Sequence, residues 1–101
     1  MNSGVGIKVV DKSLVGESDT FAVGTRVTFW TRVAGGRAGD TISHVWFHNG
    51  VRIGVTRLRV GSSDWRTQSN QLLTPEGQWA VEARDADGRI LVRHAFRTAQ
   101  R

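Results

Sequence analysis

The sequence contains no cysteine, only one proline and only two lysines, Lys8 and Lys12. Without cysteine there is no disulfide framework and no thiolate metal site, and we expect no cofactor. No segment approaches the roughly 18 to 20 apolar residues that a membrane-spanning helix needs. Residues 1–6 also lack the charged and then apolar pattern of a signal peptide. If the protein is exported, we therefore expect this chain to be part of a larger protein.

Basic residues outnumber acidic ones, which gives a formal net charge of +5 and a pI of about 11.3. From Arg26 onward every basic residue is arginine, whose planar fork suits carboxylate, sulfate or phosphate groups. Such a charge favours polyanionic partners: nucleic acid, acidic polysaccharide or an anionic membrane surface. The alternative is the codon usage of a GC-rich genome, since the arginines are spread evenly and form no single run.

The 101 residues have the size of a single domain, 1–101, with flexible ends at about 1–4 and 98–101. Strand-forming residues recur throughout, and twelve glycines suit many short strands joined by turns. No stretch shows the helical period of 3.6 residues. The sequence therefore predicts an all-β fold, an antiparallel β-sandwich of about seven strands that is immunoglobulin-like or jelly-roll-like.

Several alternating segments give the expected strands. Residues 4–10 read as a short first strand, followed by a polar loop, and residues 21–33 as a long strand with one apolar face. Residues 41–48 read as a central strand, because both of its faces carry apolar side chains. The Asn49–Gly50 pair that follows is a strong hairpin signal. Beyond it the apolar positions change phase, which predicts a bulge near Thr56–Arg57.

The last hairpin can be assigned residue by residue if Asp87–Gly88 forms a two-residue turn. The facing pairs on the apolar side are then Trp79–Phe96, Val81–His94, Ala83–Val92 and Asp85–Ile90. The pairs on the opposite side are Glu82–Arg93, Ala80–Ala95 and Arg84–Leu91. This register places opposite charges together on an outer face and apolar side chains on an inner one.

Three motifs in this order resemble the bacterial domain-of-unknown-function family 2914. They are a His-x-Trp strand at His44–Gly50, a Trp-Arg-x-x-Ser segment at Trp65–Ser69, and Gly77–Glu82 followed by Asp87–Arg89 and Phe96. The similarity spans about residues 20–97, and this chain departs from the family at His48, where another aromatic ring is common. The resemblance implies a small accessory β-domain, often outside the cytoplasm, and implies no established activity.

The residues that carry metal or catalytic chemistry are not grouped in the sequence. His44 and His48 share a strand face but lie about 13 Å apart along it, so they cannot bind one metal ion together. We expect His44 and His94 to be buried structural residues. The carboxylates mostly occupy turns, and there is no nucleophile elbow, phosphate loop or zinc motif. The sequence therefore predicts a protein that is not an enzyme.

The four tryptophans fall into two pairs. Trp79 and Trp46 alternate with apolar residues and are expected in the core. Trp30 and Trp65 each neighbour an arginine, and an exposed indole can stack on a sugar ring while arginine binds acidic groups. The alternative is that the arginine side chains simply cover the rings as packing. The predicted ligand-binding residues are Trp30, Arg32, Trp65, Arg66 and His48.

Three classes of function remain open. The first is a non-catalytic extracytoplasmic module that binds an acidic or sulfated polysaccharide. The second, almost equally favoured, is a protein-interaction or scaffolding domain of a larger bacterial envelope protein. The third is binding of single-stranded nucleic acid, which we do not expect because the arginines are interrupted by acidic residues and form no concentrated basic groove.

Overall fold

The computed structural model describes residues 2–99 and shows an all-β sandwich without a helix in that range. Ten strands are formed: β1 (Asn2–Gly6), β2 (Lys8–Val10), β3 (Ser13–Val15), β4 (Thr20–Ala22), β5 (Thr25–Ala34), β6 (Thr41–His48), β7 (Val51–Arg59), β8 (Asp64–Leu73), β9 (Gly77–Arg84) and β10 (Ile90–Ala99). The antiparallel sandwich predicted from the sequence is confirmed.

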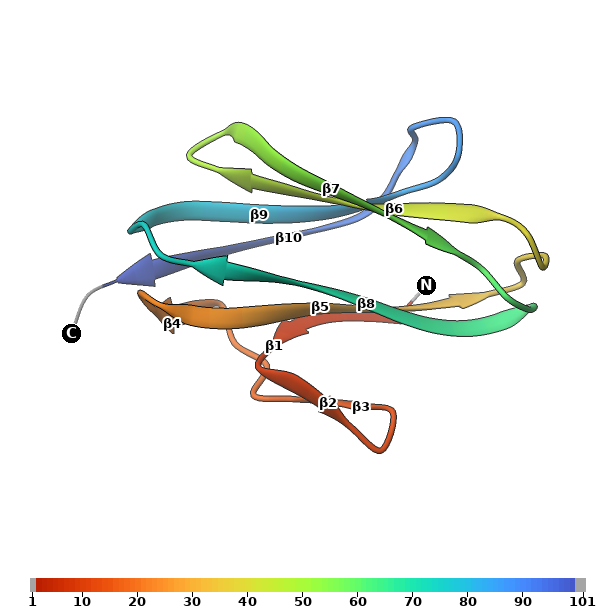
Figure 1. The fold of residues 1–101 in the computed structure, drawn as a ribbon, viewed down its shortest axis with the longest axis horizontal. Coiled ribbons are helices and arrows are strands. Elements are labelled where there is room, and N and C mark those ends of the chain that lie inside the picture. Colours follow the sequence, from red (N-terminus) through yellow and green to blue (C-terminus); the bar gives the residue numbers. More distant parts are fainter. Residues whose placement is uncertain (1, 100–101) are drawn as a thin grey trace.

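The two layers of the sandwich are a three-stranded sheet in the order β1-β5-β8 and a five-stranded sheet in the order β4-β10-β9-β6-β7. Figure 1 shows the layers edge-on, with the small β2-β3 hairpin projecting beyond the three-stranded sheet. All strand pairs are antiparallel except β4 with β10. The chain passes between the layers from β1 to β4, by way of the β2-β3 hairpin, and again after β4, β5, β7 and β8. This pattern is immunoglobulin-like rather than jelly-roll-like.

The core lies between the sheets because the alternating apolar residues of both layers point inward. Val27 and Phe29 of β5 meet Trp46 of β6 and Trp79 of β9, and all four are almost completely buried. Trp46 and Trp79 are therefore core residues, as predicted. The indole N–H of Trp79 donates to the Thr98 hydroxyl at 3.0 Å, which satisfies the polar atom of this buried ring.

The excess of strands over the expected seven comes from the first 24 residues. The single strand predicted for residues 4–10 is wrong, because it is interrupted at Ile7 between β1 and β2. The segment predicted as a polar loop contains β3, which pairs with β2. Asn2–Gly4 and Thr98–Ala99, within the ends expected to be flexible, lie in β1 and β10, while residues 1, 100 and 101 fall outside the described residues.

The β6-β7 hairpin confirms the Asn49–Gly50 turn but moves the predicted bulge. Asn49 and Gly50 have φ values of 49° and 81°, as a two-residue turn of the mirror-image type requires. The register shifts between the pairs Trp46–Gly54 and Phe47–Arg52, so the extra residue is Ile53 rather than one near Thr56–Arg57. The change of phase does mark a bulge, but the spacing of apolar residues alone does not give the position of the bulge.

The β9-β10 hairpin confirms most of the predicted register. Trp79 pairs with Phe96, and Glu82 pairs with Arg93, as do the intervening residues. The pairing predicted for Arg84 is wrong, because it faces Ile90 across a register shift. The turn is also longer than two residues.

A carboxylate holds the longer turn of the β9-β10 hairpin together. Asp85 Oδ1 accepts hydrogen bonds from the backbone N–H groups of Asp87 and Arg89, both at 2.9 Å. The Asp85 N–H donates to the carbonyl oxygen of Arg89, which closes a five-residue loop in place of the expected Asp87–Gly88 turn. The pairing predicted between Asp85 and Ile90 is therefore also wrong.

Candidate functional site

A hollow next to Trp30 joins two of the residues that the sequence singled out. Trp30 points away from the core on β5, where it pairs with Gln68 of β8. The β2-β3 hairpin folds toward this face and brings Lys12 to the rim. The hollow has a volume of about 240 Å³, and its lining consists of Val9, Lys12, Trp30, Arg66, Thr67 and Gln68. An indole, two cations and an amide therefore share one open depression.

Arg32 lies beside this hollow but is engaged elsewhere. Its Nε and one terminal nitrogen donate to the two oxygens of Asp64, both at 2.8 Å. This bidentate hydrogen bond, reinforced by the opposite charge, raises the pKa of Arg32. The same hydrogen bond from Arg32 holds the pKa of Asp64 below its usual value. Arg32 is directly across from Arg66 in the sheet, but its ion pair with Asp64 leaves it neither a free guanidinium fork nor a net charge for a ligand.

Trp65 and His48 are not part of the hollow. Trp65 precedes Arg66 on β8, so the two side chains point to opposite faces of the sheet. Trp65 is 39% exposed and packs over Gly61, where an added Cβ would lie 2.7 Å from the ring. His48 belongs to the other sheet. Its ring lies 4.6 Å from that of Trp79, and its Nε2 lies 2.8 Å from the carbonyl oxygen of Glu76.

The outer surface of the five-stranded sheet carries a concentration of positive charge that sequence reasoning missed. Its five strands contain six arginines, no lysine and a single carboxylate, Glu82. The register places all of these side chains on the side away from the core. We call this surface the arginine face, and its arginines are Arg52, Arg57, Arg59, Arg84, Arg93 and Arg97. The remainder of the sequence has eight basic and eight acidic residues, so this face accounts for the net charge.

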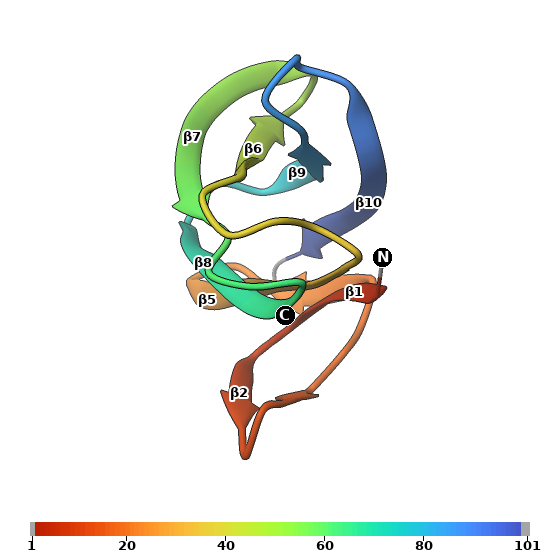
Figure 2. The same cartoon turned by 90° about the vertical axis from the view of Figure 1, so that its right-hand side faces the viewer.

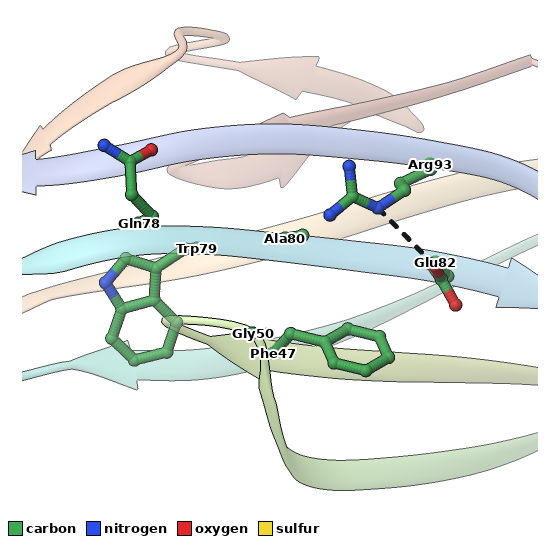
Figure 3. A pocket seen from close by; sticks show the side chains of 7 residues that line it. All are labelled: Phe47, Gly50, Gln78, Trp79, Ala80, Glu82 and Arg93. Atoms are coloured by element: carbon green, nitrogen blue, oxygen red, sulfur yellow. Dashed lines mark ion pairs between the residues drawn. The ribbon is translucent and has the colours of Figure 1, made fainter.

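A second hollow, of about 220 Å³, lies on the arginine face between Phe47 of β6 and Arg93 of β10 (Figure 3). Glu82 lines it and is only 6% exposed, although no further layer of the described chain covers this side of the sheet. Its carboxylate accepts a hydrogen bond from Arg84 Nε at 2.8 Å and lies 3.5 Å from Arg93 Nε. Arg84 also lies over the Phe47 ring, 6.0 Å from its centre. These contacts neutralise Glu82 and leave Arg93 largely exposed.

The residues capable of acid–base or metal chemistry have structural contacts. Within residues 2–99 no three histidine or carboxylate side chains are close enough together to hold a metal ion. His44 is enclosed in the core, and Ser3 Oγ lies 2.8 Å from Nε2 of His94. At the open end of the sandwich, Asp40 and Asp85 border a cleft of about 440 Å³, but their carboxylates hold their own loops through backbone N–H groups.

Strand parity in the sequence indicates only part of the arginine face. Arg93 and Arg97 are separated by an even number of residues, and so are Arg57 and Arg59. The predicted pairing of Glu82 with Arg93 already placed Arg93, and with it Arg97, on the outer face of the sheet. What the sequence lacked was the order of the strands, which sets β7, β9 and β10 in one sheet. The expectation that no basic surface is concentrated is therefore overturned by the fold.

Comparison with known protein families gives a match. The profile of a family described as "Protein of unknown function (DUF2914)" matches residues 39–98. This range contains β6 to β9 and all of β10 except Ala99, including all six arginines of the arginine face, and it excludes Trp30 and Lys12. No curated protein matches the chain. Within residues 2–99, no helix is long and apolar enough to cross a membrane.

Proposed function

The chain belongs to the DUF2914 family of proteins of unknown function, and we propose that it is a non-catalytic module that binds an acidic or sulfated polysaccharide. The observation that carries the proposal is the meeting of Trp30, Lys12 and Arg66 around one open hollow. The indole offers a flat apolar surface for a sugar ring, and the two cations that share its hollow can bind sulfate or carboxylate groups.

The geometry of the hollow suits a chain ligand rather than an enclosed small molecule. It is an open depression on the surface rather than an enclosed cavity, so a polymer can lie across it. Gln68 adds an amide that can donate to and accept from sugar hydroxyl groups. Neither Lys12 nor Arg66 forms an ion pair within the described residues, so both charges are available to a ligand.

The proposal places the protein outside the cytoplasm, as one part of a larger bacterial envelope protein, and assigns it no catalysis. The proposed location rests on the family resemblance alone, and fractionation of cells producing the full-length protein tests it. The absence of catalysis rests on the structural roles of the histidines and loop carboxylates. A protein-interaction role is the second candidate function, and the exposed apolar side chains Val51, Ile53 and Val55 on β7 favour it.

Tryptophan fluorescence during titration with a sulfated, a uronic-acid-containing and a neutral polysaccharide tests the proposal. We expect the two acidic polymers to bind and the neutral one to bind more weakly. Trp30→Ala should reduce the affinity at least tenfold at both low and high salt, because stacking is not screened. Arg66→Gln should reduce the affinity mainly at low salt, because ions screen an exposed charge.

Two matched variants locate the binding site. Trp65→Ala removes a partly exposed indole from the opposite face of β8, and Arg57→Gln removes one charge from the other sheet. Both should bind the polysaccharide almost as the unchanged protein does. If Arg57→Gln weakens binding and Trp30→Ala does not, the polymer binds the arginine face and the proposed site is wrong. If none of the polymers binds, polysaccharide binding itself is excluded for this chain.

A further inference from the structure

Strand β7 is a long edge strand with a charged and apolar pattern on one side. It ends the five-stranded sheet, so one row of its backbone N–H and C=O groups has no strand beside it within the described residues. Figure 2 shows β7 at the margin of its sheet, opposite β10. Proteins normally protect such an edge, or else use it to bind an extended segment of a partner.

On the outer side of β7, positively charged side chains lie on both sides of an apolar one. Pairing with β6 places Arg59, Arg57, Val55 and Arg52 on the arginine face, opposite Thr41, Ser43, Val45 and Phe47. Val55 is 47% exposed and lies between the paired positions of Arg57 and Arg52. The bulged residue Ile53 is 45% exposed beside it. None of the three arginines forms an ion pair within residues 2–99.

We propose that β7 binds an acidic, extended segment of a partner protein, which adds as an antiparallel strand to the five-stranded sheet. Backbone hydrogen bonds along β7 would hold the segment, and its acidic side chains would meet the arginines. Directly opposed residues in a sheet lie on the same face, with Cβ atoms about 5 Å apart. An added strand therefore repeats the spacing of β6 against β7, including the bulge at Ile53.

This spacing defines the ligand. The segment has acidic residues at its first, third and seventh positions, opposite Arg59, Arg57 and Arg52, and an apolar residue at its fifth position, opposite Val55. The even positions point toward the core side of the edge and need only small polar residues such as threonine. The sequence Glu-Thr-Glu-Thr-Val-Thr-Glu satisfies the pattern.

Charge distinguishes this occupant from a second copy of the chain. Two copies paired through β7 would bring three more arginines to the same face, where like charges repel each other. The second long edge strand, β8, differs from β7, because its Asp64 and Arg66 carry opposite charges and Asp64 is bound to Arg32. The combination of an open edge with unbalanced positive charge thus belongs to β7.

Fluorescence anisotropy with the labelled peptide Glu-Thr-Glu-Thr-Val-Thr-Glu tests the proposal. The control peptide Thr-Glu-Val-Glu-Thr-Glu-Thr has the same composition, but in any register at most two of its three acidic residues lie opposite arginines, and its valine then points to the core side. We expect the first peptide to bind at least tenfold more tightly than the control. Equal binding of the two peptides would overturn the proposal and identify the arginine face as an unspecific polyanion surface.

A charge exchange tests the pairing directly. The double variant Arg57→Glu with Arg59→Glu should no longer bind the acidic peptide. It should instead bind a peptide with lysine at the first and third positions. Both positions are exposed, so we expect the double variant to fold, and its circular dichroism and thermal transition check this. Lack of binding by the lysine peptide to the folded double variant contradicts the predicted register.

Backbone methylation separates strand addition from simple charge attraction. Two versions of the peptide carry N-methyl groups at alternate residues, so that in one version the methyl groups replace the N–H groups that would face β7. The version whose methyl groups face β7 should lose binding, and the version whose methyl groups point away from β7 should keep it. Equal binding of both versions would exclude strand addition. Trp30→Ala should leave peptide binding unchanged, so this inference and the proposed polysaccharide site can fail independently.

Discussion

The imidazole of His44 is completely enclosed between the two sheets. Its Nδ1 lies 2.6 Å from the hydroxyl oxygen of Ser69, and its Nε2 lies 3.1 Å from that of Thr31. Each hydroxyl can donate or accept, so the neutral ring is fully hydrogen-bonded in either tautomer. Burial disfavours the charged form and lowers the pKa of His44 from 6.5 to about 4.

This lowered pKa predicts that acid destabilises the fold before the carboxylates titrate. The unfolded chain binds a proton at His44 below about pH 6.5 and the folded chain only near pH 4, so stability is lost as the pH falls between these values. The loss attributable to His44 is roughly 3 kcal/mol over the whole interval. Urea denaturation between pH 7 and pH 5 measures the fall, and NMR titration of the ring measures the pKa. A midpoint near 6.5 would contradict the burial.

Among the residues of β9, we expect truncation of Trp79 to lower the free energy of unfolding most. Its indole is 3% exposed and stacks on Phe96, with ring centres 6.4 Å apart and planes inclined by 11°. Trp79→Ala should lower the free energy of unfolding by roughly 3 to 5 kcal/mol. Chemical denaturation measures this, with the partly exposed Trp65→Ala as a control that should cost less. A loss below about 1 kcal/mol at Trp79 would show that the ring is not part of the core.

Residue environments were only partly predictable from the sequence. Trp46 and Trp79 were assigned to the core because they alternate with apolar neighbours. Trp65 was paired with Arg66 because they are adjacent in the sequence, yet adjacent residues of a strand point to opposite faces. The partner of Arg32 proved to be Asp64, which is 32 residues away and becomes a neighbour only through the pairing of β5 with β8.

At the scale of the elements, the loop between β9 and β10 depends on one glycine and one carboxylate. Gly88 has a φ of 83°, as the expected two-residue Asp87–Gly88 turn would also require, although the turn around it is longer. An added Cβ at Gly88 would meet nothing within 4 Å, so a substitution there is strained by the backbone conformation alone. A substitution at Gly88 therefore tests the effect of the positive φ angle without a contribution from steric contacts.

Gly88→Val should therefore lower the free energy of unfolding by about 1 to 2 kcal/mol, because a β-branched residue is strongly disfavoured at positive φ. Gly88→Asn should cost clearly less, since asparagine tolerates this conformation better than other side chains. Thermal or urea denaturation of the two variants gives the comparison. Equal losses for valine and asparagine would mean that the backbone at this position is not held at positive φ.

The elements themselves were predictable where the signal was local. The Asn49–Gly50 turn and the register of Trp79 with Phe96 follow from turn chemistry and alternation within one hairpin. The β2-β3 hairpin was missed because its turn, at Asp11 and Lys12, uses non-glycine residues with φ values of 49° and 67°. The bulge at Ile53 was misplaced because only the partner strand determines which residue is left unpaired.

At the scale of the whole molecule, the fold brings arginines that are spread along the sequence together on one face of the five-stranded sheet. Strand order is a long-range property, and the sequence pattern did not supply it. The consequence is that the six arginines of the arginine face repel one another with only Glu82 to offset them. Like charges gathered on one side of a compact protein oppose folding, and dissolved salt weakens this repulsion.

We therefore expect the free energy of unfolding to rise when salt is added at low ionic strength, before general salt effects dominate. The double variant Arg52→Gln with Arg59→Gln should show a smaller rise and should be more stable than the unchanged protein at the lowest salt. The matched control is Lys8→Gln with Arg37→Gln, which lowers the net charge equally at exposed positions off this face. Urea denaturation at several salt concentrations gives the slopes. If both double variants change the slope equally, net charge alone sets the salt response, and the grouping of the arginines has no energetic consequence.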